Sequence, residues 1–340
     1  MRTLLYLNGN DGSQLGIEDG FSYQKNQGKI EQLNWFYFTE YEKKYGSKAT
    51  LQQMLIIAKE FKPELIIFFH IGNLKIDSSF LKSVKNISTK PVLVYDEGDM
   101  YGTWSKPVNS RMKSIIAFSD IVSIRGLGKF YRNISKLNKN LIYTPHHNNI
   151  ARYGDDSPIK KKRDNDLIFI GNKVSTRIPF GIRRLPGARG REMFVKKIGQ
   201  EFNNFKLYGK GWENYNGNSG KVDFFKQNEY YKNTWLTLAY EHYPKVPYYF
   251  SNRLPMALMN GSLYVCHYHK GYEKMFPNCD FIFFFKTNNE AIDIINYLLS
   301  LSTEELLSRS RNAREFAYRQ YHPNVIWGNF YNNILKTLSK

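Results

Sequence analysis

Short apolar segments of strand length alternate with helical segments along most of this 340-residue chain. Strands that are joined through helices run parallel, and a parallel sheet is covered by helices on both faces. The first half of the chain is therefore expected to form one doubly wound α/β domain. Its predicted strands lie at residues 3–7, 31–37, 64–69, 91–95, 120–124 and 141–144.

Two helices between these strands show clear signals. Residues 47–62 place Leu51, Met54, Leu55 and Ala58 on one face at helical spacing. Asp77 stands before another helical period, where its carboxylate can cap the free backbone N–H groups of the first turn.

Residues 145–164 interrupt the alternation and contain little that a core could bury. Such segments join domains, and the basic run at 160–163 is expected to be solvated. We therefore predict an N-terminal domain at 1–150, a linker at 151–164, a C-terminal domain at 165–322 and a last helix at 323–340. In the C-terminal domain we expect strands at 166–170, 205–208 and 235–240, helices at 189–202 and 223–233, and later helices that begin at capping boxes 287–290 and 302–305.

The segment 249–285 predicts a loop, a short helix ended by Gly261, a buried strand, a second helix and another strand. Its loop residues Ser251, Asn252 and Arg253 would then stand at a helix N-terminus beside a strand end. Free N–H groups and the helix dipole favour an anion at that place, and α/β domains hold nucleotide phosphates there. An ordinary αβα layer with an exposed arginine is the alternative.

Composition restricts the class of partner and the compartment. Lys and Arg number 49 against 30 Asp and Glu, so the formal charge of +19 indicates an anionic partner: a nucleotide, a nucleic acid, a phospholipid surface or an acidic glycan. No apolar run reaches the roughly 18 residues of a membrane span, and a signal peptide is not expected. Cys266 and Cys279 stand in apolar sequence, as reduced thiols of a cytoplasmic protein do.

Two loops of the first half are candidates for chemistry. The loop at 8–16 lacks the glycine spacing of a dinucleotide fingerprint or a P-loop, so Gly9, Asp11 and Gly12 are expected to let a substrate approach the backbone. Three carboxylates follow the fourth strand, Asp96, Glu97 and Asp99. Their mutual repulsion is expected to raise a pKa and create a general base.

The alternatives for this acidic loop are a solvated surface loop and a weak Mg²⁺ or Ca²⁺ site. His70, at the end of the third strand, is a second candidate base or acceptor ligand. A buried, hydrogen-bonded histidine is the other interpretation of that position.

Loops of the second half are rich in arginine and glycine. Gly171 and Asn172 precede a segment that contains Arg177, Arg183, Arg184, Arg189 and Arg191. Guanidinium forks suit phosphate oxygens, although a solvated basic loop has the same composition. The run Tyr208, Gly209, Lys210, Gly211 and Trp212 offers a flexible cationic turn, in which Tyr208 or Trp212 stacks on a base or Trp212 packs into its own domain.

Several segments, in this order, resemble a GT-B glycosyltransferase of the group-1 family that includes CgeB-like spore-maturation proteins. They are Phe-Ile-Gly-Asn at 169–172, an arginine that opens a helix (Arg189 or Arg191), Tyr-Gly-Lys-Gly-Trp at 208–212, Tyr-Tyr-Lys at 230–232, 251–261, Gly-Tyr-Glu at 271–273 and Tyr-His at 321–322. The resemblance covers residues 165–322 well, and the first half only in strand order and in its acidic loop.

This resemblance implies two Rossmann-like domains that face each other across a cleft, with a nucleotide-sugar in the second domain and the acceptor in the first. It places Arg253 near the pyrophosphate and implies a terminal helix that crosses back to the first domain. Members usually carry a glutamate as ribose ligand where this chain has Met256, so Glu273 or Glu241 takes its place or nucleotide binding is altered. The implied donor ligands are Gly171, Asn172, Arg189, Arg191, Tyr208, Gly209, Lys210, Gly211, Trp212, Ser251, Asn252, Arg253 and Glu273.

The sequence thus predicts transfer of a sugar from a nucleotide-sugar to an acceptor hydroxyl of a glycan, a lipid-linked saccharide or a protein. We expect inversion, because the paired glutamates of many retaining relatives are missing, and cationic side chains in place of a metal. Asp99 is the first choice of base. Such an enzyme of cell-surface polysaccharide synthesis needs no cofactor and no nucleic acid, and its charge suits an anionic membrane. A noncatalytic binder of an anionic polymer or membrane, or a degenerate transferase, is the alternative.

Overall fold

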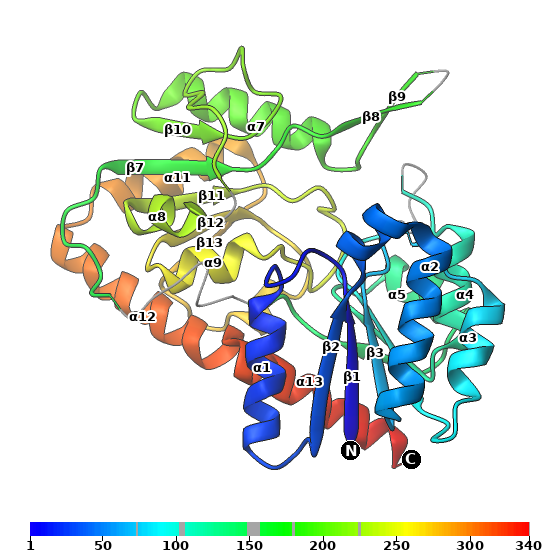
Figure 1. Cartoon of the computed structure of the whole chain (residues 1–340). Helices are drawn as coiled ribbons and strands as arrows, with labels where there is room; N and C mark the ends of the chain where they lie inside the picture. Colours follow the sequence, from blue (N-terminus) through cyan, green and yellow to red (C-terminus); the bar gives the residue numbers. More distant parts are fainter. Residues whose placement is uncertain (73, 102–105, 148–156, 179–180, 224–225, 340) are drawn as a thin grey trace. The chain divides into compact units, whose positions relative to one another are not determined.

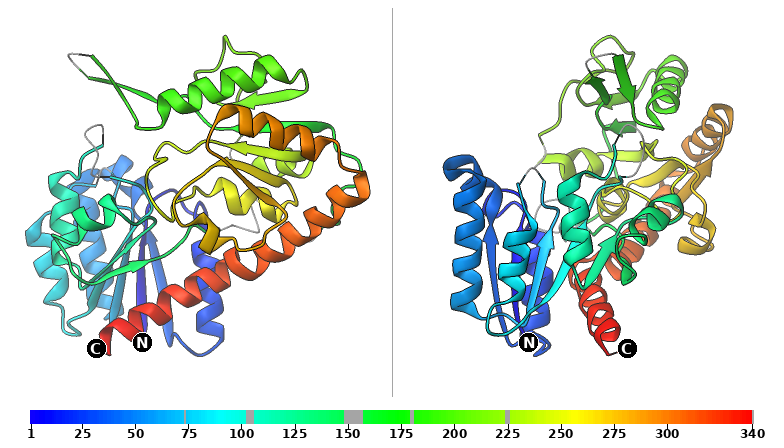
Figure 2. Two further views of the ribbon diagram at one scale, coloured as in Figure 1. Left: turned by 180° about the vertical axis from the view of Figure 1, so that it is seen from behind. Right: turned by 90° about the vertical axis from the view of Figure 1, so that its right-hand side faces the viewer.

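The computed structural model describes residues 1–72, 74–101, 106–147, 157–178, 181–223 and 226–339. Two compact units divide the chain: Met1–Pro145 together with Pro323–Lys340, and His146–His322. Each unit contains its own parallel sheet with helices packed against it (Figures 1 and 2). The predicted class, two doubly wound α/β domains, is confirmed.

The sheet of the first unit has the strand order β2-β1-β3-β4-β5-β6, and every neighbouring pair is parallel. All six predicted strands are present, each within two residues of its expected bounds. They are β1 (Arg2–Leu7), β2 (Gln32–Tyr37), β3 (Leu65–Phe69), β4 (Val92–Glu97), β5 (Ile121–Ile124) and β6 (Leu141–Tyr143).

Helices connect these strands: α1 (Leu15–Asn26), α2 (Phe38–Phe61), α3 (Ser78–Lys85), α4 (Ser110–Phe118) and α5 (Lys129–Ile134). The carboxylate of Asp77 accepts the N–H of Phe80 at 2.8 Å, as its predicted N-cap role requires. Helix α2 begins well before the expected residue 47, because a kink at Gly46 (φ 79°) joins a second helical segment to it.

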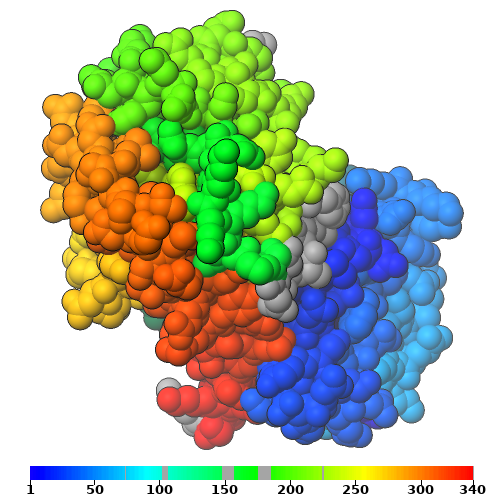
Figure 3. Space-filling model, turned by 90° about the vertical axis from the view of Figure 1, so that its left-hand side faces the viewer, coloured from blue at the N-terminus to red at the C-terminus, as the bar shows by residue number. Residues whose placement is uncertain are grey.

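The last helix, α13 (Pro323–Leu338), packs on α1 within the first unit, where the two lie side by side in Figures 1 and 3. The contact is closest at Gly20. A Cβ atom there would stand 2.3 Å from Cδ1 of Trp327 and 2.8 Å from the carbonyl oxygen of Pro323. The absence of a side chain at Gly20 is therefore what lets the two helices approach.

Gly20→Ala should lower the free energy of unfolding by about 1–3 kcal/mol, the usual effect of overpacking, even though alanine is the better helix former. Gly98→Ala is the matched control, because a Cβ atom at Gly98 would meet nothing within 4 Å. Urea unfolding of both variants measures the difference, and equal stability would show that the α1–α13 contact is loose.

The sheet of the second unit has the order β10-β7-β11-β12-β13, again entirely parallel. Its strands are β7 (Asn165–Ile170), β10 (Phe205–Tyr208), β11 (Thr234–Ala239), β12 (Leu263–His267) and β13 (Ile282–Phe285). Its helices are α7 (Ala188–Glu201), α8 (Gln227–Lys232), α9 (Arg253–Met259), α10 (Tyr272–Met275), α11 (Asn288–Leu299) and α12 (Thr303–Tyr321). Both predicted capping boxes are formed, at Thr287 with Glu290 and at Ser302 with Glu305.

Backbone groups of the segment 217–220 lie along the free side of β10. The N–H of Leu207 donates to the carbonyl of Gly217 at 2.8 Å, Ser219 donates to Leu207 at 2.8 Å, and Gly209 donates to Gly220 at 2.9 Å. The loop after β10 is thereby fixed against the sheet.

Two expectations were wrong. The arginine- and glycine-rich segment after β7 forms an antiparallel hairpin, β8 (Ser175–Ile178) and β9 (Gly181–Arg184), rather than a loop. Residues 151–156 of the predicted linker lie outside the described residues, but the basic run that follows is not all solvated. Arg163 is buried and donates to the carbonyls of Thr234 (2.5 Å) and Gly261 (3.1 Å).

None of the helices in the described parts of the chain has the length and apolar character that crossing a membrane demands.

Candidate functional site

Two arginines from different elements of the second unit meet at the carboxyl end of β7. Arg253 begins α9, and Arg191 lies in the first turn of α7. Together with Glu241 and Ser251, which follow β11, they form what we call the arginine cluster: Arg191, Glu241, Ser251 and Arg253. In an open α/β sheet this edge is the place where ligands bind.

Arg253 is held by three partners. Its Nη2 atom lies 2.6 Å from Oε2 of Glu241, its Nε donates to Oγ of Ser251 at 2.9 Å, and its Nη1 donates to the carbonyl of Ile170 at 3.2 Å. Ser251 in turn donates to Oε1 of Glu241 at 2.8 Å, so both oxygens of the carboxylate are engaged. The guanidinium therefore has one fixed orientation.

Arg191 is almost completely buried, with 2% of its surface exposed. Its Nε donates to the carbonyl of Tyr240 at 2.7 Å, and its Nη1 lies 3.1 Å from the carbonyl of Asn172 and 2.7 Å from Nε2 of His242. Its Nη2 atom has no hydrogen-bond partner among the described residues. A buried donor of this kind is costly unless a ligand satisfies it.

Gly171 brings the two guanidinium groups together. A Cβ atom at this position would stand 2.6 Å from Nη1 of Arg253 and 3.6 Å from Nη1 of Arg191. Two like charges thus share one small buried space with a single carboxylate, Glu241. The cluster carries an uncompensated positive charge, and this favours a bound anion.

The pKa values of the cluster follow from this arrangement. Burial, together with the charge of Arg253, lowers the pKa of Arg191 to about 9. Burial alone would raise the pKa of Glu241, but the guanidinium groups of Arg253 and Arg191 lower it to about 2. Burial likewise acts to lower the pKa of Arg253, and Glu241 raises it above its ordinary value. The carboxylate stays ionised at neutral pH and holds Arg253 in place.

Gly171→Ala is expected to push the Arg253 guanidinium away from Ile170 and weaken anion binding at the cluster. The loss of one charge-assisted hydrogen bond corresponds to a rise of about tenfold or more in the Kd of a nucleoside diphosphate. Calorimetric titration with UDP measures this, and a thermal melt of the same sample checks that the second unit is folded. Unchanged affinity would show that the anion does not approach Gly171.

The loop after β10 is tied to the loop after β7. Trp212 donates from its indole Nε1 to the carbonyl of Gly171 at 2.6 Å, and the N–H of Lys210 donates to Oδ1 of Asn172 at 2.8 Å. Gly209 adopts φ 139°, and a Cβ atom there would stand 2.4 Å from the carbonyl oxygen of Gly171. The residues 208–212 therefore position Gly171 and Asn172.

Stacking of Trp212 on a nucleotide base is not supported, because its side chain is completely buried against Phe169 and Tyr215. Tyr208 is half-buried, and its ring packs on Tyr230 at 4.8 Å between ring centroids. Of the two roles considered for Trp212, base stacking and packing into its own domain, the structure shows the packing role.

The candidates for a ribose ligand are all occupied or buried. Met256 is a core residue of α9 with 1% exposure. Both carboxylate oxygens of Glu241 are already bonded, to Arg253 and to Ser251. The Glu273 carboxylate accepts the hydroxyl of Tyr268 at 2.9 Å and the N–H of Gly271 at 3.2 Å and is exposed.

Asn252 is half-buried at the N-cap of α9 and makes no side-chain capping bond. Lys210 and Gly211 stand at the surface-facing turn after β10, where Gly211 has φ 92°. Arg189 is exposed, two residues before Arg191, the first buried residue of α7.

In the first unit each of the three loop carboxylates has its own partner. Asp96 is buried and receives both Nη1 and Nη2 of Arg125, at 2.8 and 2.5 Å. Asp99 is half-exposed and lies 2.6 Å from Nζ of Lys106. Asp96 is thus held in a buried ion pair, and each carboxylate of the loop is engaged by another side chain rather than only by its acidic neighbours. The base roles of Asp96, Glu97 and Asp99 stay predictions.

Glu97 and His70 form the remaining pair. Nδ1 of His70 lies 2.7 Å from Oε1 of Glu97, whose other oxygen accepts the hydroxyl of Tyr95. Burial acts to lower the pKa of His70, but the hydrogen bond and charge of Glu97 and the charge of Asp99 raise it above its ordinary value of 6.5. His70 also has φ 39°, a strained left-handed conformation that is typical of functional positions.

The glycine loop after β1 is closed by internal bonds. Gly9 donates its N–H to Oγ1 of Thr39 at 2.8 Å, and that hydroxyl donates to Oδ1 of Asn8 at 2.6 Å. Asp11 is exposed, and Gly12 is half-buried with φ 67°. Their acceptor-binding role remains a prediction.

Residues 183–331 match the family model described as Glycosyl transferase-like. Arg191, Glu241, Ser251 and Arg253 all belong to this segment. No curated protein sequence matches the chain significantly.

Solved structures with low sequence identity share the fold of the whole chain. HepE (Alr3699) of Anabaena, in complex with UDP and glucose, has a TM-score of 0.59 at 12% identity, with 100% of both chains covered. AviGT4, a glycosyltransferase involved in avilamycin A biosynthesis, has a TM-score of 0.60 at 12% identity, with 100% of this chain and 98% of AviGT4 covered. A glycosyltransferase from Rickettsia africae has a TM-score of 0.61 at 12% identity, with 98% and 99% covered.

The fold is therefore that of the GT-B glycosyltransferases, with two Rossmann-like units. Residues 183–331 are thus similar to glycosyl transferase-like sequences, and the whole chain shares its fold with solved glycosyltransferases. The narrower CgeB-like group to which the sequence pattern points stays a prediction.

Proposed function

We propose that this protein transfers a sugar from a nucleoside diphosphate sugar to an acceptor hydroxyl. The observation that carries the proposal is the arginine cluster. It holds one buried and one partly exposed guanidinium group against one carboxylate, at a sheet edge where phosphates bind. The Nη2 atom of Arg191 has no partner among the described residues.

The chemistry of transfer explains why such a cluster is useful. When the bond between the sugar and the diphosphate breaks, negative charge grows on the leaving diphosphate. Fixed cationic groups in a site that excludes water stabilise this charge without any reorganisation at the moment of reaction. Because Arg253 is fixed by Glu241, Ser251 and Ile170, its orientation is set before the substrate arrives.

Structures with this fold support a uridine nucleotide as the donor to test first. HepE of Anabaena has been crystallised with UDP and with UDP-glucose. At 14% identity these complexes do not assign the base or the sugar to this chain. They suggest UDP as the nucleotide to titrate first.

Calorimetric titration with UDP and with UMP tests the proposal directly. If the cluster binds the diphosphate, UDP should bind about tenfold or more tightly than UMP, because the β-phosphate adds charge-assisted hydrogen bonds. Equal affinity for the two nucleotides would contradict the assignment of the arginine cluster. Turnover of UDP-glucose with a panel of acceptor glycans then tests transfer itself.

The proposal also covers the anomeric configuration of the product and the requirement for a metal ion. We assign deprotonation of the acceptor hydroxyl to His70, positioned by Glu97, with displacement in one step and inversion at the anomeric carbon. The cationic cluster takes the place that a metal ion has in other enzymes. NMR of the first-formed product gives its anomeric configuration, and turnover in EDTA compared with Mn²⁺ measures the metal requirement. A product with retained configuration would overturn the inverting mechanism, and full loss of turnover in EDTA would overturn metal independence.

A further inference from the structure

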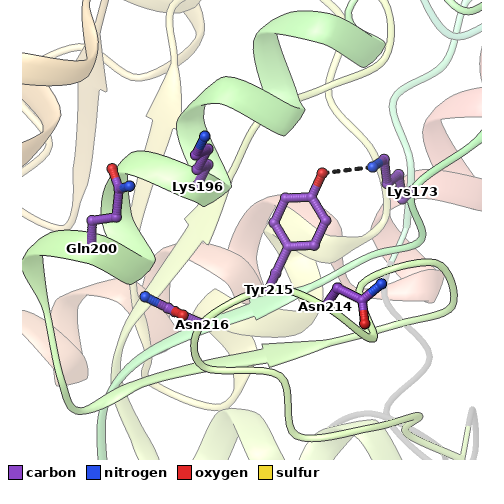
Figure 4. Close-up of a pocket in the computed structure, with 6 residues that line it drawn as sticks. All are labelled: Lys173, Lys196, Gln200, Asn214, Tyr215 and Asn216. Carbon is purple, nitrogen blue, oxygen red and sulfur yellow. Dashed lines mark hydrogen bonds between the residues drawn. The ribbon is translucent and has the colours of Figure 1, made fainter.

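A polar pocket lies in the second unit, beside α7. It has a volume of about 460 Å³ and is lined by Lys173, Lys196, Gln200, Asn214, Tyr215 and Asn216 (Figure 4). Lys196 and Gln200 come from the later turns of α7, beyond Arg191, while Asn214, Tyr215 and Asn216 come from the loop after β10. None of the six belongs to the arginine cluster, and nothing in the proposed donor chemistry uses them.

The loop that forms one wall of this pocket is held in place by close packing and hydrogen bonds. Gly199 of α7 lets the loop approach closely, since a Cβ atom there would stand 2.8 Å from the carbonyl oxygen of Asn216. The N–H of Tyr215 donates to the carbonyl of Trp212 at 3.0 Å, and the segment after it is bonded along β10. The loop that carries Asn214, Tyr215 and Asn216 therefore has a fixed place against α7.

The Tyr215 ring is oriented by two charged groups. Nζ of Lys173 donates to the tyrosine hydroxyl at 2.6 Å, as Figure 4 shows, and that hydroxyl donates to Oε1 of Glu192 at 2.6 Å. Nζ of Lys173 also lies 2.9 Å from Oε1 of Glu192. This triad fixes the ring and neutralises Lys173, which leaves Lys196 as the lining cation without a paired carboxylate in the described chain.

The remaining polar side chains are available to a ligand. Among the described residues, the side chains of Lys196, Gln200, Asn214 and Asn216 form no hydrogen bond or ion pair with one another or with a neighbour. Each amide offers both donor and acceptor groups, and the ammonium of Lys196 offers three donors. Amides beside an oriented aromatic ring and one ammonium group form a set that matches a sugar with hydroxyl groups, an apolar C–H face and a carboxylate.

We propose that this pocket binds an acidic saccharide unit, a uronate residue of the glycan on which the enzyme acts. Only the link to the acceptor glycan rests on the proposed function, while binding of the saccharide is a property of the pocket itself. The volume is in the range of about 300–1,000 Å³ that holds small ligands. The charge of +19 over the whole chain is in keeping with an acidic glycan as partner.

Tetragalacturonate is the probe, and maltotetraose is the neutral oligosaccharide of the same length. The intact chain should bind tetragalacturonate by calorimetry and bind maltotetraose at least about tenfold more weakly. Absence of tetragalacturonate binding, or equal binding of the two, would overturn the proposal.

Lys196→Gln should weaken tetragalacturonate binding about tenfold, which is the usual value of one charge-assisted hydrogen bond. Lys197→Gln is the matched control. Lys197 is the next residue on α7 and its substitution removes the same charge, but its side chain pairs with Glu201 and does not line the pocket. An equal loss in both variants would show diffuse attraction to a basic helix and refute a specific site. Asn214→Ala should also weaken binding, since it removes an amide without changing the charge.

UDP is titrated into the same variants. We expect Lys196→Gln and Asn214→Ala to leave UDP affinity unchanged, because neither residue belongs to the arginine cluster. Saccharide binding without UDP binding would remove the proposed function and keep this pocket, and the reverse result would remove only the pocket.

Discussion

Arg253→Met should abolish measurable UDP binding and also lower the free energy of unfolding by about 3–5 kcal/mol, the usual effect of removing one partner from a buried ion pair. Glu241 is 3% exposed and relies on Arg253 at 2.6 Å for most of its compensation. Methionine keeps the apolar stem but leaves this carboxylate buried beside the carbonyl-rich end of β7. Urea unfolding measures the loss of stability.

The effect on stability should depend on pH in a defined direction. In the wild-type protein the pKa of Glu241 is lowered to about 2, from an ordinary value of 4.5. Its contribution is therefore fully present above pH 4.5 and is lost as the pH falls through 2. Without Arg253 this stabilisation disappears, so the difference between variant and wild type should be largest at neutral pH and shrink in acid.

The double variant Arg253→Met with Glu241→Gln separates stability from binding. Removing both charges should restore most of the lost stability, because a neutral pair of similar volume avoids the unpaired carboxylate. UDP binding should stay weak. A double variant that binds UDP like the wild type would show that Arg253 is a structural residue and not a phosphate ligand.

His70→Asn is expected to reduce kcat by about 10²–10⁴, the usual contribution of a general base, while leaving UDP affinity unchanged. Asparagine is chosen because it tolerates the left-handed conformation of His70, at φ 39°, better than most residues. Steady-state kinetics with UDP-glucose and the best acceptor measure the effect. A kcat within a few-fold of wild type would remove His70 from the reaction.

Glu97→Gln tests the positioning role of Glu97 through the pH profile. Since Glu97 raises the pKa of His70 above 6.5 against the effect of burial, its removal should lower that pKa. The acidic limb of the kcat/KM profile, where His70 becomes protonated and inactive, should then move to lower pH. A limb that does not move would show that Glu97 has only a structural role.

Asp99→Asn is the comparison that decides between the two candidate bases of the first unit. Asp99 is half-exposed, and its carboxylate is engaged in an ion pair with Lys106. We expect a modest change in kcat for this variant. A collapse of kcat in Asp99→Asn together with normal turnover in His70→Asn would restore the choice made from the sequence.

Most of the strands could be predicted from the sequence because they are short, nearly continuous apolar runs, as buried parallel strands are. The hairpin β8–β9 was missed for the opposite reason. Val174, Ile178 and Ile182 fall on alternate positions, as strand residues do, but the arginines and the Pro-Phe-Gly sequence between them favoured a loop.

The sequence also contained signals that were not used. Arg191 shares a helical face with Phe194, Val195 and Ile198, all buried, and this spacing distinguishes it from the exposed Arg189. His70 follows Phe69, which pairs with Asp96 in the sheet register, so the next pair along these strands is His70 with Glu97. Once β3 and β4 are known to be neighbours in the sheet, their strand ends account for this contact.

Other features could not be predicted from the sequence. The pairing of Glu241 with Arg253 joins the end of β11 to the start of α9 and depends on where the intervening loop turns back. The burial of Arg163 links residues separated by up to 147 positions, and a basic run gives no sign of it. Both depend on tertiary packing rather than on local pattern.

The segment 217–220, bonded along β10, has a consequence for how the protein behaves at high concentration. An outermost strand with unsatisfied amide and carbonyl groups can recruit a strand from another molecule and so begin aggregation. Because Leu207 and Gly209 already bond to this segment, that side of the second sheet is closed to such recruitment. Substitutions of Gly217 or Gly220 that detach the segment should therefore first appear as self-association, before any loss of secondary structure.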